Sequence, residues 1–166
     1  MLAAGIALLV TLGIADAPVE SFKEAVAKYG PLDLNYKMIV ERKHIVEFSF
    51  EPYGFDWKTR LNKDLVTPLK FVFTELKARG LTKELTKFNG CYVSRSIRGS
   101  KRPSTHAFGL ACDFDHKPYS KEFVEVWRRY GFTWGGDWCN GRDYMHFSFA
   151  YEQPATDECR YHKDEN

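Results

Sequence analysis

The sequence predicts a small α+β domain with a central, mostly antiparallel sheet and flanking helices. Segments with strand-like alternation and segments with helical spacing follow one another without the regular strand–helix–strand order that builds a parallel sheet. The chain has 166 residues, 44% of them hydrophobic and 16% aromatic, which is enough for one domain with its own core. The formal net charge is only +2, so the total charge does not indicate binding to nucleic acid or to a membrane surface.

Three helices are predicted from capping residues and apolar spacing. A capping box that begins at Ser21 precedes a short first helix. The second runs from about 67 to 79, with Thr67 as its cap and Pro68 at the first helical position. The third runs from about 120 to 130. Apolar side chains of the last two helices fall on one face of each and are expected in the core: Leu69, Val72, Phe73, Leu76, Phe123, Val126, Trp127 and Tyr130.

Strands are predicted where apolar and polar residues alternate. The predicted extended segments are 36–50, 91–93, 110–114, 132–134 and 144–149. Successive side chains of a strand point to opposite faces, so Asp113 and His146 lie opposite the apolar residues of their strands. Two neighbouring strands would therefore bring Asp113 and His146 to one surface.

His106 supplies a third candidate ligand for a metal ion. It lies seven residues before Asp113, and this odd spacing would point the two side chains to opposite sides of one straight strand. Gly109 between them offers a bend that lets both face one point. Two imidazoles and one carboxylate suit zinc, and a catalytic site uses three protein ligands and leaves a fourth position for water. The sequence therefore predicts a Zn²⁺ site formed by His106, Asp113 and His146.

Hydrolysis at such a site needs a proton acceptor and a cation. A free carboxylate near the metal takes the proton of the attacking water and passes it to the leaving amine, and Asp143 is the candidate. A fixed cation stabilises the developing oxyanion, with Arg95 as the first candidate. Taken alone, Asp143 is also explained as a turn cap, and the basic run around Arg95 as a solvated loop. Four further residues are assigned to substrate binding or to holding the ligands in place: Arg98, which is also the second candidate cation, Ser104, Asp137 and Trp138.

The four cysteines are Cys91, Cys112, Cys139 and Cys159, and no two of them form a C-x-x-C pair. A zinc knuckle built from cysteines is therefore not indicated. The even number allows disulfides in an exported protein, and free or buried thiols are an equal alternative. Cys112 lies on the apolar face of its strand and is expected in the core.

Three motifs together resemble a known family. They are S-x-H-x-x-G-x-A-x-D from residue 104, W-G-G-D-W from residue 134 and D-x-M-H-F from residue 143. In this order and spacing they resemble the zinc peptidases of the D-alanyl-D-alanine carboxypeptidase family (peptidase family M15). The pattern is most similar to the branch of L-alanyl-D-glutamate peptidases found as phage endolysins and bacterial wall hydrolases. The resemblance covers roughly Leu65 to Phe149.

This resemblance implies the same Zn²⁺ ligands, Asp143 as general base and Arg95 as the cation near the scissile carbonyl. It implies the small α+β fold shared with the signalling domain of Hedgehog proteins. The implied partner is the stem peptide of peptidoglycan, whose carboxylates suit the basic loop before His106. The sequence departs from the family at Ser148, where an acid is frequent, and at Cys112, where an aliphatic residue is usual.

The predicted organisation is a peptidase domain over 62–150, an N-terminal extension over 18–61 and a polar tail over 151–166. Residues 1–14 are uncharged and 15–17 resemble a small-x-small cleavage site, so 1–17 are interpreted as a signal or anchor segment. The alternative is a packing or assembly helix, because no basic residue precedes the apolar run and Pro18 would follow the cut directly. Any membrane contact is expected through residues 1–15 alone.

The leading hypothesis is an L-alanyl-D-glutamate endopeptidase that acts on the cell wall, either exported or encoded by a phage. A D-alanyl-D-alanine carboxypeptidase of the same chemistry is the first alternative. A wall-binding or virion structural module that keeps the metal without catalysis is the second, and Asp143 and Arg95 argue against it because a structural zinc needs neither. We expect a monomer unless the protein is part of a virion, and no nucleic-acid partner.

Overall fold

The computed structural model of the chain describes residues 10–11, 13, 17–30, 44–97, 103–139 and 141–150. Its longer helices are α2 (Phe22–Tyr29), α3 (Lys63–Ala78) and α4 (Lys121–Arg129). Its strands are β1 (Ile45–Ser49), β2 (Lys58–Asn62), β3 (Ala111–Asp113), β4 (Thr133–Trp134) and β5 (His146–Ser148). Two short 3₁₀ helices, η4 (Thr105–Phe108) and η5 (Gly135–Asp137), complete the elements that matter for the site. The predicted α+β class is confirmed.

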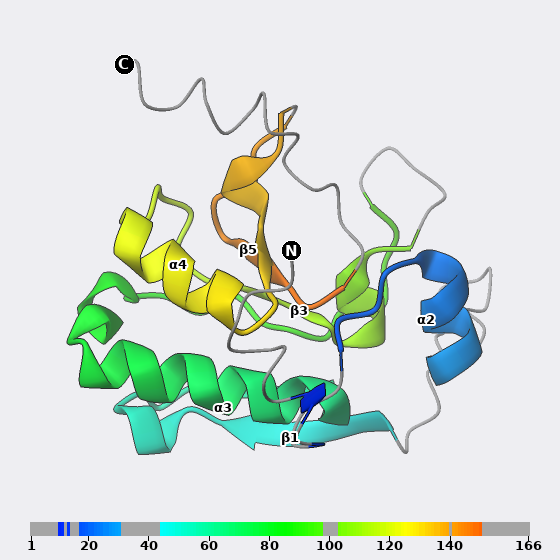
Figure 1. Cartoon of the computed structure of the whole chain (residues 1–166), viewed down its shortest axis with the longest axis horizontal. Coiled ribbons are helices and arrows are strands. Elements are labelled where there is room, and N and C mark those ends of the chain that lie inside the picture. The colour runs from blue at the N-terminus through cyan, green and yellow to red at the C-terminus, as the bar shows by residue number, and fades with distance from the viewer. Residues whose placement is uncertain are drawn as a thin grey trace.

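The strands form two small antiparallel sheets. Strands β1 and β2 pair as a hairpin, with Ile45 opposite Asn62 and Ser49 opposite Lys58. The second sheet has the order β3-β5-β4, so β5 pairs on both sides. Figure 1 shows α3 between the β1–β2 hairpin on one side and α4 with the second sheet on the other. The antiparallel pairing was predicted, whereas the division into two sheets was not.

A large hydrophobic core joins the hairpin, α3, α4 and the three-stranded sheet. Its most buried large side chains come from all four: Phe50, Leu61, Leu65, Phe73, Phe114, Phe123, Trp127 and Phe147. Ring contacts connect them, such as Phe50 with Phe73 at a centroid distance of 4.8 Å and Trp127 with Phe147 at 4.3 Å. Residues on both sides of position 62 thus share one core, and the predicted division of the chain there stays a prediction.

A smaller hydrophobic cluster fixes α2 against η4. Tyr29 of α2 and Phe108 of η4 are buried in it, together with Val19, Ala25, Leu110 and Ala150. The Tyr29 hydroxyl donates to Asp64 Oδ2 at 3.0 Å, and Lys28 Nζ lies 3.1 Å from the same oxygen. Helix α2 therefore rests on the turn that carries His106. No helix in the described ranges has the length and apolarity that crossing a membrane requires.

Helix α3 begins earlier than the sequence pattern predicted. Asn62, not Thr67, is its N-cap, and Asn62 Oδ1 accepts from the N–H of Asp64 at 3.1 Å. Pro68 lies inside the helix, where its ring removes one backbone donor, and is buried there. The prediction of Pro68 at the first helical position was wrong. The helix begins after the Asn62 cap, six residues before Pro68, and Asn is at least as favourable a cap as the Thr67 that was predicted.

Strand β2 was not predicted from the sequence, and the predicted elements that are present differ mainly in length. Ser21 caps α2 through its hydroxyl, as predicted, and Ser120 caps α4 in the same way at the predicted start of that helix. The strand predicted over 91–93 is wrong: these residues form no strand, and only the neighbouring Gly90 makes an isolated bridge, to Asp113. Of the predicted segment 36–50, residues 36–43 lie outside the described residues, as do most of 1–17 and all of 151–166.

Candidate metal centre

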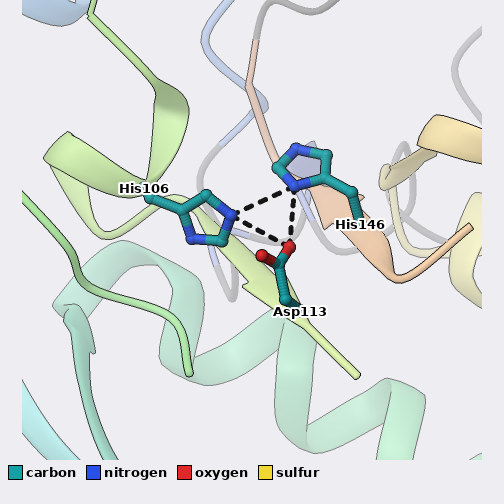
Figure 2. Close-up of side chains that lie close together, drawn as sticks. All are labelled: His106, Asp113 and His146. Carbon is teal, nitrogen blue, oxygen red and sulfur yellow. Dashed lines mark hydrogen bonds and ion pairs between the residues drawn. The ribbon is translucent and has the colours of Figure 1, made fainter. Parts of the chain in front are cut away.

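Three side chains that are distant in the sequence meet at one point (Figure 2). His106 Nε2 and His146 Nδ1 each lie 2.9 Å from Asp113 Oδ1, and the two ring nitrogens are 3.1 Å apart. Both histidines are buried, and the Asp113 side chain is 15% exposed. The structure thus brings the three predicted ligands together as a compact triangle of ligand-type atoms.

His106 is positioned by the short turn η4. Ser104 caps the turn, because its Oγ accepts from the backbone N–H of His106 at 3.3 Å. Gly109 ends the turn with a φ of +69° and donates its N–H to the His106 carbonyl at 3.0 Å. A Cβ at position 109 would lie 2.7 Å from the backbone nitrogen of Asn62, so no side chain fits. The predicted bend at Gly109 is present as the end of a 3₁₀ turn.

The second nitrogen of His106 bonds to the backbone and carries a proton there. Nδ1 lies 2.7 Å from the carbonyl oxygen of Cys91. A carbonyl oxygen only accepts hydrogen bonds, so Nδ1 carries the proton and donates it there. Nε2 is then the ring atom that faces Asp113 and His146: it donates to Asp113 when the ring is charged and offers its lone pair to a metal ion when the ring is neutral. A metal-binding histidine has this same arrangement, with its other ring N–H donated to a carbonyl.

Asp113 and His146 are brought together by the register of β3 and β5. The two residues are directly opposite each other in this antiparallel pair, so their side chains share one face of the sheet. Burial of the Asp113 carboxyl opposes its ionisation, but hydrogen bonds from His106 and His146 and their charge outweigh this effect. The net result is a pKa of Asp113 well below its usual range, so the carboxylate is ionised at neutral pH.

The donor set fits a zinc ion. Zinc–nitrogen and zinc–oxygen bonds of about 2.0–2.1 Å place neighbouring ligand atoms of a tetrahedral site about 3.3 Å apart. The three atoms here are 2.9–3.1 Å apart and need to separate only slightly. One ionised carboxylate and two imidazoles, one with its tautomer fixed, are donors that zinc takes. The geometry therefore supports a metal site at the three residues.

Asp143 lies in the loop that enters β5, as predicted. Its backbone carbonyl accepts from the N–H of His146 at 3.2 Å, and its N–H donates to the carbonyl of Gly135 at 3.0 Å. The side chain is 36% exposed as a whole, while its Oδ1 is buried and has no hydrogen-bond partner among the described residues. A partly exposed carboxylate of this kind, tied to a ligand through the backbone, can exchange a proton with a substrate.

Gly135 sets the position of Asp143. A Cβ at Gly135 would lie 2.4 Å from the Asp143 carbonyl oxygen and 3.1 Å from its Cβ. The carbonyl of Gly135 also accepts from the N–H of Trp138 at 3.3 Å. The Trp138 ring lies 5.5 Å from the His146 ring, measured between centroids. The glycine-rich turn thus places Asp143 and Trp138 beside the third ligand, and only glycine fits at 135.

The other predicted site residues have different surroundings. Arg95 is exposed, and its Nη1 lies 3.4 Å from the carbonyl of Ser96. Arg98 lies outside the described residues. Asp137 is buried and accepts from Arg128 Nη2 of α4 at 2.5 Å, so its carboxylate anchors η5 to that helix. The roles predicted for Arg95, Arg98 and Asp137 stay predictions.

Sequence reasoning did not find two features of the site. Cys91 and Cys112 form a disulfide, and Cys139 is also disulfide-bonded. Cys112 is buried, as predicted, but its pairing has no signal in the spacing. The side chain of His116 is 60% exposed, and its Nδ1 lies 3.9 Å from Asp143 Oδ1. A carboxylate and a histidine separated by 27 positions give no local pattern.

Fold and site together define a small α+β domain with a candidate metal centre and a partly exposed carboxylate on the loop that leads to the third ligand, an arrangement that suits a metal-dependent hydrolase. Residues 98–149 match the family model described as D-alanyl-D-alanine carboxypeptidase, of peptidase family M15. The matched segment contains His106, Asp113, Asp143 and His146, and it confirms the resemblance to the M15 peptidases. A comparison with curated proteins finds no match.

Proposed function

We propose that the protein is a zinc-dependent L-alanyl-D-glutamate endopeptidase that cleaves the stem peptide of peptidoglycan, in the manner of an endolysin. The observation that carries the proposal is the His106–Asp113–His146 triangle with Asp143 beside it. The family match supports a peptidase acting on peptidoglycan peptides. The choice of the L-Ala–D-Glu bond rests on the motif spacing of the endolysin-like branch.

Each residue then has a defined task in hydrolysis. His106, Asp113 and His146 would hold the zinc ion, which supplies Lewis acidity that polarises a carbonyl and lowers the pKa of water to about 7. Asp143 takes the proton of the attacking water at its carboxylate and delivers it to the nitrogen of the departing amine. The proton thus moves from water to the leaving group, while water oxygen replaces nitrogen on the carbonyl carbon.

Two further residues act on the substrate in this proposal. The guanidinium of Arg95 stabilises the negative charge that develops on the carbonyl oxygen, or binds a stem-peptide carboxylate. Trp138, which packs against His146, forms an apolar wall beside the reacting bond. The target places the protein at the cell wall, after export or after release from a phage-infected cell, and acting as a monomer.

A D-alanyl-D-alanine carboxypeptidase is the second candidate, favoured by the description of the matching family. The chemistry at the metal is the same in both enzymes, and the difference lies in which part of the stem peptide the site accepts. An endopeptidase accepts chain on both sides of the bond, whereas a carboxypeptidase needs a free terminal carboxylate. The two candidates are therefore distinguished by their products.

The test is product identification on purified peptidoglycan. Wild-type protein loaded with zinc should release peptides with a new N-terminal D-Glu, found by mass spectrometry, and a chelator should abolish the release. Asp143→Asn should lower the rate by about 10²–10⁴-fold, the usual contribution of a general base, and should still bind zinc. Free D-alanine without new D-Glu termini supports the carboxypeptidase. No chelator-sensitive product from zinc-loaded protein would contradict both candidates.

A further inference from the structure

Two of the three ligands are held by one short segment, residues 89–93. On one side, the segment bonds to Asp113: the N–H of Asn89 donates to the Asp113 carbonyl at 2.8 Å, and the N–H of Asp113 donates to the Gly90 carbonyl at 2.9 Å. The segment is therefore attached to β3, at the edge of the second sheet, by a single bridge between Gly90 and Asp113.

On its other side, the same segment bonds to His106. The carbonyl of Cys91 accepts from His106 Nδ1 at 2.7 Å, and the N–H of Val93 donates to the His106 carbonyl at 3.1 Å. Both the ring and the backbone of His106 are thus oriented by residues 91–93. The distance between His106 and Asp113 depends on how this segment lies against β3.

The Cys91–Cys112 disulfide fixes the segment at the point where it leaves the sheet. The Cα atoms of the two cysteines are 4.0 Å apart, and both residues are fully buried. Cys112 directly precedes Asp113 in β3, and its side chain lies in the core on the opposite face. Cys91 provides the carbonyl that orients His106. The covalent bond therefore joins Cys91, whose carbonyl orients His106, to β3, the strand that carries Asp113.

Hydrogen bonds alone hold this junction weakly. The pairing of the segment with β3 consists of one isolated bridge, and a ladder of several pairs is what gives a sheet its stability. Beyond the bridge the segment bonds to His106 of η4 and no longer to β3, through the Cys91 carbonyl and the Val93 N–H. The disulfide is placed where the hydrogen-bonded contact ends.

We propose that the Cys91–Cys112 disulfide is a positioning element of the metal centre. It holds the Cys91 carbonyl in the place that orients His106 relative to Asp113, and its loss weakens zinc binding by the folded protein. The inference rests on the proposed function, because the metal concerned is that of the proposed peptidase. Supporting groups of this kind contribute about 10–100-fold to metal affinity in proteins.

The test measures zinc affinity in a variant without the disulfide. Cys91→Ala with Cys112→Val removes the bond and keeps an apolar side chain in the core. Zinc dissociation constants are determined by competition with a chromophoric chelator, at a temperature where circular dichroism shows folded protein. We expect about 10-fold or more weaker binding than in the wild type. The NMR signal of the His106 Nδ1–H should be sharp in the zinc-loaded wild type and broadened in the variant.

A matched control separates positioning from stability. Leu76→Ala removes buried volume from α3, and no metal ligand lies in that helix. It should lower the unfolding temperature and leave the zinc dissociation constant as in the wild type. If the double variant is only partly folded, the zinc-induced shift of the urea midpoint gives its affinity, because a ligand stabilises the native state according to its dissociation constant.

Three outcomes overturn the inference in different ways. Equal zinc affinity of wild type and double variant contradicts it and leaves the proposed function intact. Equal weakening in Leu76→Ala shows that the disulfide acts through stability alone. Absence of zinc binding by the wild type contradicts the proposed function itself, and the inference with it.

Discussion

The two halves of the site are held in different ways. The metal-binding half consists of His106, Asp113 and His146, which are buried or nearly so and lie on backbone that bonds to neighbouring elements. The half expected to meet the substrate, Asp143 and Arg95, lies on loops and is more exposed. The difference teaches that this fold places the candidate metal ligands in its interior and the residues proposed for substrate chemistry at its edge.

If the comparison holds, substitutions in the two halves have separable effects. Asp113→Ala should have the largest effect, because it removes a ligand and leaves His106 and His146 without the carboxylate to which both bond. We expect zinc affinity to fall by at least about 100-fold, the upper end of what supporting groups alone contribute, and peptidase activity to fall with it. Metal analysis after dialysis against a weak chelator measures the loss. Full zinc occupancy in this variant would rule out the assigned ligands.

Gly135→Ala should act mainly on the other half, because Asp143 lies against Gly135 while the strand of His146, β5, is held between β3 and β4. Its Cβ would lie 2.4 Å from the Asp143 carbonyl oxygen, so the loop must move by roughly 1 Å to reach normal contact. A misplacement of this size near the reacting groups costs on the order of 100-fold in rate. We expect kcat to fall by that factor while zinc content stays at the wild-type level.

Gly80→Ala is the control for Gly135→Ala. A Cβ at Gly80 would have no heavy atom within 4 Å, and this glycine follows α3 with a φ of +68°. Its replacement adds only backbone strain, so stability should fall slightly and kcat should not change. A similar loss of kcat in both variants would show that general destabilisation, not the position of Asp143, limits the reaction.

Asp115→Asn should have the smallest effect, and this effect should be confined to the free energy of unfolding. Asp115 Oδ2 accepts from the N–H groups of Thr86 at 2.8 Å and Lys87 at 3.0 Å. Partial burial opposes ionisation, but these bonds and the Thr86 hydroxyl outweigh it and lower the pKa of Asp115. The ionised carboxylate therefore stabilises the fold at pH values above its unfolded-state pKa near 3.9. This contribution is lost as the pH falls through the lower pKa of the folded state.

Urea unfolding of Asp115→Asn across pH checks this prediction. At pH 7 the variant should be less stable by about 1 kcal/mol, as expected for hydrogen bonds at a partly solvated site. The difference between variant and wild type should decrease below about pH 4. A difference that grows in acid would have the wrong sign. Zinc affinity and kcat should match the wild type, because Asp115 bonds to the 86–87 loop and not to the ligands.

Much of the ligand set could be predicted from the sequence because it depends on local patterns. The alternation around Asp113 and His146 placed both on one face, and Gly109 indicated the bend that brings in His106. The start of α3 was missed because Asn62 and Thr67 are both acceptable caps. The helix begins at Asn62, and Pro68 is buried inside it. Local preference cannot choose between two such starts.

Long-range contacts could not be predicted in the same way. The Cys91–Cys112 bond joins positions 21 residues apart, and four cysteines allow three pairings with equal local support. The contact of Asp137 with Arg128 depends on how α4 packs against the second sheet.

The packing of α2 on η4 bears on how short a working fragment of this protein can be. Val19, Tyr29 and Phe108 share one buried cluster, and Val19 also bridges to Ala150, which follows β5. A fragment trimmed to 62–150 would expose Phe108 and remove the surface on which the turn carrying His106 rests. A fragment that begins at Pro18 keeps this support, so the region over which the family motifs are found is shorter than the unit that holds the metal centre in shape.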